Sequence, residues 1–345
     1  MDTASTSSVF ARRKLLGILS GSWVAQACYA VAKLGLPDAM AAGPRRVAEL
    51  AEECGADARV LNRLLRAMVS MGLFRQTAPQ TYALTSVTEL LRSDVPGSLR
   101  QMAVLDGEEV YRSFADIMYT VRTGAPAFES IYGEPFYSCL SGRPELAATF
   151  ADAMSAAQVS AALPLCDLAG SELLVDVGGG SAGLLAAALV RHPGLRGVLL
   201  ELPEAVRQAK VTVADAGVEN RVELVEGDFF ERVPAGGDTY VLARVLHNWT
   251  DERAELILRR VREAMMTGGT SDGRLIVIEQ LLPDADNEPG PGKGMVDLLM
   301  LVLLEGYDRT QAEYVRLLER TGFALRTVRH GTGTDADSML EAMPV

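Results

Sequence analysis

The stretch "LLVDVGGGSAGLL" (residues 173–185) joins an apolar run to a glycine-rich loop and then to a second apolar run. The first run predicts a strand that ends at Asp176, and the second predicts a helix. Glycines after a strand let the chain turn tightly and approach a ligand without an intervening side chain. The stretch lacks both the G-x-G-x-x-G spacing of dinucleotide binders and the Gly-Lys-Ser/Thr of a P-loop. It therefore predicts a nucleotide cradle without naming the nucleotide.

From about residue 170 onward, short β-like runs alternate with helical ones. The alternating runs are residues 173–177, 184–191, 197–201, 203–216, 221–225, 238–246, 251–266, 274–280 and 310–321. Such alternation predicts a parallel sheet with helices on both faces, which is a doubly wound α/β fold. Ligands bind at the carboxyl ends of the strands in these sheets, so we expect the chemistry of the protein to lie there.

The first half of the chain has a mainly helical pattern. The segment "VAELAEECGADARVLNRLLRAMVSMGLFRQ" (47–76) predicts two helices, with Asp57 as the N-cap of the second. The segment "TYALT" (81–85) then predicts a short strand, which completes the order of a winged helix. We expect residues 1–165 to form a helical domain and residues 166–345 to form the α/β domain.

The charge and the cysteine content of the chain argue against some classes of binding partner. The formal net charge of −12 over 345 residues argues against nucleic-acid binding, so we expect the winged helix to serve as a dimer interface. A regulator built on the winged helix stays open, because the segment 58–70 is locally basic. The cysteines show no close pairing and predict reduced thiols in the cytoplasm without a metal site. These cysteines are Cys28, Cys54, Cys139 and Cys166.

The segment "RRKLLGILSGSWVAQACYA" (12–30) has the basic start and apolar middle of a signal peptide. Gly17 and Gly21 interrupt its apolar part, and helical spacing continues to Leu34, so we expect an amphipathic helix over residues 15–36. We find no apolar run of the roughly 18 residues that a membrane span needs. The expectation is therefore a protein without a membrane partner.

Acidic and aromatic residues follow the next predicted strands. Glu201 stands about twenty residues after the glycine loop, where a carboxylate suits a ribose diol, and a helix-capping or solvated acid is the alternative. Asp228 can accept a hydrogen bond from an adenine amino group, and Phe229 can lie against a base. A loop acid and a core aromatic remain the alternatives for this pair.

The segment "ARVLHNWTDE" (243–252) places His247 at the predicted end of a strand, with a helix opening at Thr250. An imidazole titrates near neutrality, so it can take the proton of a phenol as that oxygen attacks an electrophile. Glu279 and Asp308 are the acids that could orient the ring. A purely structural histidine packed beside the following tryptophan stays open.

The motifs "VDVGGGSAG", "LLELP", "EGDFF", "VLHNWTDE", "IVIE", "DLLML" and "DRT" occur in this order. With them the sequence resembles the plant caffeate and flavonoid-type O-methyltransferases and their bacterial natural-product relatives, above all enzymes that methylate aromatic polyketides. The resemblance covers nearly the whole chain. It implies a Rossmann-like S-adenosylmethionine methyltransferase domain behind a winged-helix-like dimerisation domain. It further implies a homodimer, a small aromatic acceptor, S-adenosylhomocysteine as product, no metal, and a place in antibiotic or other secondary metabolism.

The resemblance also implies roles for individual residues. His247 matches the general base of the family, flanked by Glu279 and Asp308. The implied cofactor contacts are Asp176, Gly178, Gly179, Gly180, Glu201, Leu202, Gly227, Asp228, Phe229 and Arg244. The implied acceptor contacts are Phe150, Met154, Asn248, Trp249, Met300 and Leu304. By spacing alone the two methionines fit a helix core equally well.

Four positions depart from the family pattern. Asn248 stands where an acid is usual, and Ala243 stands where a basic residue often occurs. Glu201 replaces an aspartate, and Asp308 replaces a glutamate. The shorter carboxylate at 308 raises the possibility that it holds His247 through a water molecule.

We therefore expect transfer of the methyl group of S-adenosylmethionine to a phenolic hydroxyl. The same residues would also support carbon methylation ortho to a phenol, because deprotonating the phenol activates the ring. A relative that keeps the fold and cofactor without transferring methyl is a further alternative.

Overall fold

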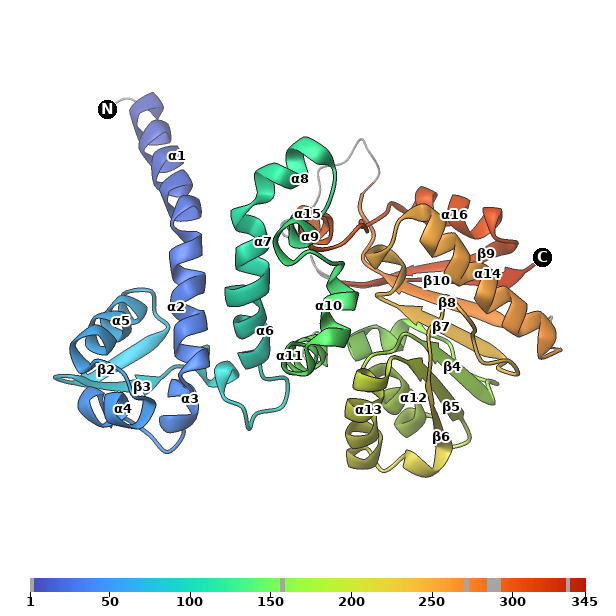
Figure 1. Cartoon of the computed structure of the whole chain (residues 1–345), viewed down its shortest axis with the longest axis horizontal. Helices are drawn as coiled ribbons and strands as arrows, with labels where there is room; N and C mark the ends of the chain where they lie inside the picture. The colour runs from blue at the N-terminus through green and yellow to red at the C-terminus, as the bar shows by residue number, and fades with distance from the viewer. Residues whose placement is uncertain (1–2, 156–158, 270–272, 284–292, 333–335) are drawn as a thin grey trace. The chain divides into compact units, whose positions relative to one another are not determined.

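The computed structural model describes residues 3–155, 159–269, 273–283, 293–332 and 336–345. The chain divides into two compact units, Met1–Tyr111 and Arg112–Val345 (Figure 1). The boundary at residue 165 that composition suggested thus falls inside the second unit. Between residues 112 and 165 the described segments, 112–155 and 159–165, are mainly helical, as expected, and they belong to the second unit.

The first unit contains the winged-helix pattern. Its elements are α1 (Thr3–Leu19), α2 (Gly21–Lys33), α3 (Leu36–Ala39), β1 (Arg45–Arg46), α4 (Val47–Cys54), α5 (Ala58–Ser70), β2 (Phe74–Ala78), β3 (Thr81–Leu84) and α6 (Arg100–Leu105). In its described residues the strands form an antiparallel sheet of order β1-β3-β2. Asp57 caps α5 as expected, because its Oδ1 accepts the N–H groups of Arg59 and Val60 at 2.9 and 3.0 Å.

Helices α1 and the start of α2 carry many exposed apolar side chains. Those more than half exposed are Val9, Phe10, Leu15, Leu16, Ile18, Leu19 and Trp23. By length and composition alone, the stretch Val9–Lys33 would suffice to cross a membrane, contrary to the expectation from sequence. A helix that packs against a second subunit has the same properties.

The second unit opens with helices and continues as an α/β domain. The helices are α7 (Tyr111–Ala115), α8 (Ile117–Thr123), α9 (Ala127–Tyr132), α10 (Phe136–Gly142) and α11 (Pro144–Ser155). The strands are β4 (Leu173–Val177), β5 (Arg196–Glu201), β6 (Val222–Glu226), β7 (Thr239–Ala243), β8 (Arg274–Glu279), β9 (Phe323–His330) and β10 (Ser338–Pro344). Among the described residues they form one sheet of order β6-β5-β4-β7-β8-β10-β9. Strands β4 to β8 pair in parallel, which confirms the predicted sheet.

Helices cover both faces of this sheet (Figure 1). On one face, α12 (Gly183–Arg191) and α13 (Pro203–Asp215) bury Leu185 and Val213 against Leu199. On the other face, α14 (Asp251–Thr267) and α16 (Gln311–Arg320) bury Ile257 and Leu317 with the sheet. The two cores confirm the doubly wound, Rossmann-like architecture.

Two features differ from the sequence analysis. Strands β9 and β10 were not predicted, and β10 runs antiparallel to both β8 and β9. Strand β7 ends at Ala243 instead of residue 246, because Arg244 adopts a left-handed φ of 57° and turns the chain out of the sheet. His247 therefore lies on a short 3₁₀ turn, Leu246–Asn248, and not at a strand end.

Candidate active site

Asp176 lies near the carboxyl end of β4 and is completely buried. Neither of its carboxylate oxygens has a hydrogen-bond partner among the described residues. Burial, and secondarily the nearby carboxylate of Glu201, raise the pKa of Asp176 to about 7. A buried acid without a partner is unusual in a protein core and marks a position where a ligand can satisfy it.

The glycine loop lies directly against this acid. A Cβ on Gly179 would come within 2.2 Å of Asp176 Oδ2, so only glycine fits there. Gly178 has a left-handed φ of 71°, and a Cβ there would crowd Val245 and Phe229. The loop therefore combines a left-handed backbone turn with a position, Gly179, at which any side chain would collide with the acid.

Glu201 joins this loop to the end of β5. Its carboxylate accepts hydrogen bonds from the backbone N–H groups of Leu202 and Gly180. Burial raises its pKa, and these two hydrogen bonds act in the opposite direction. Gly227 donates its N–H to the carbonyl of Glu201 at 3.0 Å, which places the end of β6 alongside. The three strand ends singled out from the sequence thus lie side by side.

Asp228 follows β6 and is exposed, with Oδ1 accepting the N–H of Phe230 at 2.8 Å. Phe229 is partly buried and packs edge to face against Phe230, with ring centroids 4.9 Å apart. Trp249, expected at the acceptor, packs on this pair, at 4.8 Å from Phe230 and 6.2 Å from Phe229. The tryptophan therefore belongs with the aromatic residues at the end of β6.

Tyr137 on α10 also belongs to this cluster. Its ring stacks on Trp249 with centroids 5.3 Å apart, and it lies edge to face with Phe150 at 6.2 Å. Burial, and secondarily the charge of Glu201, raise the pKa of Tyr137. Its neighbours come from α10, α11 and the turn after β7, and no sequence spacing connects these segments.

His247 is buried and held through both its ring and its backbone. Its Nδ1 lies 3.1 Å from Asp308 Oδ1, so the shorter acid reaches the ring directly and without a bridging water. Glu279 acts on the backbone instead, because its Oε1 accepts the N–H groups of Leu246 at 2.9 Å and of His247 at 3.3 Å. Of the two acids expected to flank the base, one orients the ring and the other orients the turn.

The electrostatics of these acids suit a proton acceptor. Glu279 Oε2 and Asp308 Oδ2 are buried without a partner among the described residues. Burial raises the pKa of Glu279, while the charges of His247 and Arg244 act in the opposite direction. With Nδ1 engaged by a carboxylate, the second ring nitrogen of His247 is the one that can take a proton.

The remaining residues predicted from the sequence lie either in the turn that carries His247 or on helices α11 and α15 (Lys293–Leu303) and at the residue after α15. Arg244 pairs with Asp337 at 3.4 Å, and Asn248 donates from Nδ2 to the carbonyl of Arg244 at 3.2 Å. Met300, on α15, is buried, whereas Met154 on α11 is 39% exposed. Leu304 donates its N–H to the carbonyl of Met300 at 2.7 Å. The structure thus gives Arg244 and Asn248 protein partners.

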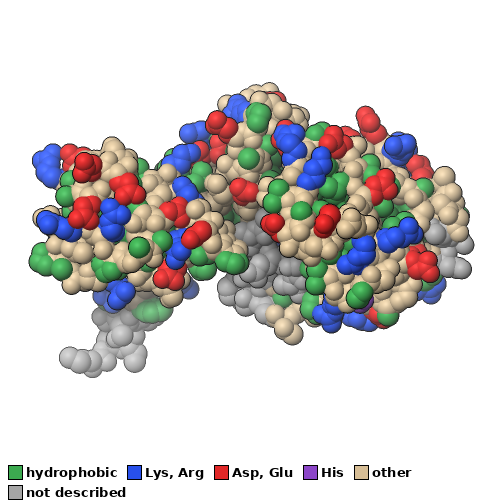
Figure 2. All heavy atoms as spheres, turned by 90° about the horizontal axis from the view of Figure 1, so that it is seen from below, with side chains coloured by type: hydrophobic (Ala, Val, Ile, Leu, Met, Phe, Trp, Pro, Cys, Tyr) green, Lys and Arg blue, Asp and Glu red, His purple; other side chains and the backbone are tan. Residues whose placement is uncertain are grey.

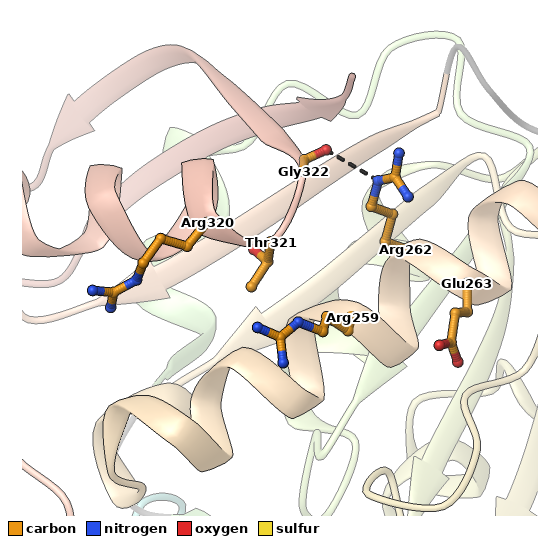
Figure 3. A pocket seen from close by; sticks show the side chains of 6 residues that line it. All are labelled: Arg259, Arg262, Glu263, Arg320, Thr321 and Gly322. Carbon is orange, nitrogen blue, oxygen red and sulfur yellow. Dashed lines mark hydrogen bonds between the residues drawn. The ribbon is translucent and has the colours of Figure 1, made fainter.

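A hollow elsewhere on the surface is lined by α14 and the end of α16 (Figure 3). Its arginines already have partners: Arg259 pairs with Glu255 at 2.6 Å, and Arg320 pairs with Asp251 at 2.8 Å. Arg262 donates to the carbonyl of Gly322 at 3.2 Å. On the face shown in Figure 2, basic and acidic side chains are likewise interspersed. In the part of the chain that the structure describes, no cluster of side chains could hold a metal ion.

Comparison with known proteins shows the family of the chain. Residues 16–94 match the O-methyltransferase dimerisation domain, and residues 111–324 match the O-methyltransferase domain. Phenazine O-methyltransferase of Lysobacter antibioticus is 39% identical over 96% of both chains. O-demethylpuromycin-O-methyltransferase of Streptomyces alboniger is 39% identical over 97% of this chain and 90% of its own. Phenazine-1-carboxylate N-methyltransferase of Pseudomonas aeruginosa is 35% identical over 94% of this chain and 95% of its own.

A solved structure resembles nearly the whole chain as well. It is an O-methyltransferase from neocarzinostatin biosynthesis, in complex with S-adenosylmethionine and 2-hydroxy-5-methyl naphthoic acid. It is 35% identical, with a TM-score of 0.77, and the match covers 93% of this chain and 96% of that one. The chain therefore belongs to the O-methyltransferase family and is an S-adenosylmethionine-dependent O-methyltransferase with that family's dimerisation domain.

Proposed function

We propose that the protein methylates a phenolic hydroxyl of an aromatic natural-product precursor, with His247 as the general base. The observation that carries this proposal is the buried contact of 3.1 Å between His247 Nδ1 and Asp308 Oδ1. This contact leaves the second ring nitrogen to accept a proton. The relative named as a phenazine O-methyltransferase and the solved structure in complex with a naphthoic acid support an aromatic acceptor.

The residues at the ends of β4, β5 and β6 fit S-adenosylmethionine. The unpartnered carboxylate of Asp176 suits a cationic ligand, and the glycine loop beside it places no side chain between the two. Glu201 suits the ribose, and Phe229 suits the adenine ring. When bound, the cofactor supplies an electrophilic methyl group on a sulfonium. No metal is part of this proposal.

The chain's own residues would assist the reaction in two ways. A neutral phenol has a pKa of about 10, so removing its proton during attack can contribute about 10²–10⁴ in rate. Holding the oxygen in line with the reacting methyl at about 3–3.5 Å contributes further. Asp308 would stabilise the imidazolium that forms and keep the ring in one orientation. Glu279 would hold the turn that carries the ring.

The test is methyl transfer by purified protein to a panel of simple phenols and hydroxylated polyketides, with cofactor binding measured by calorimetry. We expect cofactor binding without acceptor and transfer to a ring hydroxyl. Product analysis separates this from carbon methylation ortho to the hydroxyl. Cofactor binding with no methylated product from any acceptor would instead favour a family member that does not transfer methyl.

Nitrogen methylation is a second candidate, favoured by the similarity to phenazine-1-carboxylate N-methyltransferase. A ring nitrogen attacks through its lone pair and loses no proton before attack. A nitrogen acceptor would therefore make turnover largely independent of His247. Turnover of aza-aromatics that survives loss of the imidazole would favour this candidate.

We expect Gly179→Ala to weaken cofactor binding about 100-fold or more. The added methyl would lie 2.2–2.5 Å from the three carboxyl atoms of Asp176, so either the loop or the acid must move. A misplacement of about 1 Å can cost an enzyme about 10²-fold in rate, and we expect a loss of similar size in cofactor binding. Calorimetry checks the result, and Gly183→Ala is the matched control, because its Cβ would meet nothing within 4 Å. Equal affinities of the two variants would contradict a tight cradle.

The exposed apolar face of α1 and α2 fits a homodimer formed through the N-terminal domain. We expect deletion of residues 1–36 to give monomers or insoluble protein, because that face and its core contacts are lost. Light scattering of the purified protein checks this result. A stable dimer after the truncation would show that the subunits associate through another surface.

A further inference from the structure

We propose that Arg309 is a positioning residue for the base, because it fixes the turn that presents His247. Its side chain is completely buried, although it carries a positive charge. A buried charge is costly unless it is paired and hydrogen-bonded, so its contacts show what the charge is used for. This inference rests on the proposed role of His247.

The guanidinium of Arg309 forms hydrogen bonds on both sides of His247 in the turn. Its Nη1 donates to the carbonyl of Leu246 at 3.0 Å, and its Nη2 donates to the carbonyl of Trp249 at 2.8 Å. These two carbonyls flank His247 in the chain. A rigid planar group that holds both of them fixes the direction in which the intervening side chain leaves the backbone.

The arginine is itself held from the other side. Its Nε donates to Asp251 Oδ1 at 3.0 Å, and the same oxygen accepts the hydroxyl of Tyr307 at 2.7 Å. The ring of Tyr307 lies against the guanidinium, with 4.2 Å from Cζ to the ring centroid. Asp251 begins α14, so the turn is tied to the first residue of a long, well-packed helix.

Neighbours of Arg309 in the chain act on the same turn. Asp308 contacts the ring of His247. Gly306 lies so close that a Cβ there would come within 2.1 Å of the carbonyl oxygen of His247. The segment 306–309 thus touches the ring, the carbonyl of the histidine and both flanking carbonyls.

The chain offers a matched control. Arg262 on α14 also donates to two backbone oxygens. One belongs to Gly322 at 3.2 Å (Figure 3), and the other belongs to Val345 at 2.7 Å. Those oxygens belong to the end of α16 and the C-terminus, away from the His247 turn. Arg262→Met should therefore lower the melting temperature while leaving kcat per folded molecule unchanged.

The experiment compares Arg309→Met and Arg309→Lys with Arg262→Met on two acceptors. One acceptor is a simple phenol that is un-ionised at the assay pH, and the other is a nitrophenol that is already ionised there. We expect Arg309→Met to lower kcat on the un-ionised phenol about 10²-fold, with cofactor affinity unchanged. The defect should shrink on the ionised acceptor, which needs no base. Lysine can replace only part of the planar fork, so Arg309→Lys should show a smaller loss.

If Arg309→Met does not fold, Gly306→Ala is the second variant. Its added methyl would displace the carbonyl of His247, so its loss of kcat should likewise be larger on the un-ionised phenol than on the ionised one. An unchanged kcat in the folded Arg309 variants, or equal defects on both acceptors, would overturn the positioning role. If His247→Ala itself turns over the un-ionised phenol at the normal rate, the general base fails instead, which is a separate outcome.

Discussion

Replacing His247 with alanine should lower kcat on an un-ionised phenol by about 10²–10⁴, the contribution of a positioned general base. In this variant Glu279 would still hold the backbone of the turn, and Asp308 would keep its negative charge. The loss follows because no imidazole would be present to accept the proton of the phenol. Cofactor affinity should stay close to that of the wild type, since none of the proposed cofactor contacts is changed. Steady-state rates of product formation and calorimetric binding measure the two quantities.

His330→Ala is the matched control for this substitution. His330 lies on β9, where its Nδ1 is 3.2 Å from Ser338 Oγ, and it has no place in the proposed site. We expect normal turnover from this variant. A His247→Ala enzyme as active as the control would show that His247 is structural, and that positioning alone or a pre-ionised acceptor accounts for the rate.

The affinity for S-adenosylmethionine should fall about tenfold for each pH unit below 7, because a cationic ligand favours the ionised form of Asp176. The burial that raises the pKa of Asp176 to about 7 places this transition within the physiological range. Calorimetric titrations between pH 5.5 and 8 measure the slope. Asp176→Asn should bind more weakly above pH 7 and lose the slope.

Asp228→Asn is the comparison, because this exposed acid should affect affinity without removing the pH dependence. An Asp176→Asn variant that keeps the wild-type slope would assign the proton to another group. The cofactor-free protein offers an independent check. A carboxyl whose pKa rises on folding stabilises the fold below its unfolded pKa of about 4 and loses this contribution as pH rises through 7. The melting temperature of the wild type should therefore fall more than that of Asp176→Asn between pH 5.5 and 8.

Local patterns in the sequence were sufficient to predict the parallel sheet and the glycine loop that follows its first strand. Strand β4, its glycine loop and α12 follow from apolar runs around Gly178–Gly180, because a buried parallel strand and a tight turn impose these residue types. Parallel strands bring their carboxyl ends to one edge, so Asp176, Glu201 and Asp228 could be placed together before any coordinates. The cap at Asp57 was equally local and was confirmed.

Other features depended on contacts between distant segments. Strand β10 pairs with β8 and β9 although it follows α16, and its antiparallel direction has no signature in the helix–strand alternation. The end of β7 was misplaced because the apolar run continues to Leu246, whereas the left-handed backbone of Arg244 ends the strand earlier. Tyr137 joined the aromatic cluster through packing between elements far apart in the chain.

The sequence by itself determined which residue types are available at the site: a histidine, two acids, and glycines after a strand. Tertiary structure decided which part of the turn each acid contacts. Asp308 reaches the ring and Glu279 takes the backbone, because hydrogen bonding depends on distance and direction, which residue spacing does not specify. Arg309 shows the same limit, because a charged residue in a sequence suggests an exposed side chain, whereas folding buries this one against the carbonyls of Leu246 and Trp249.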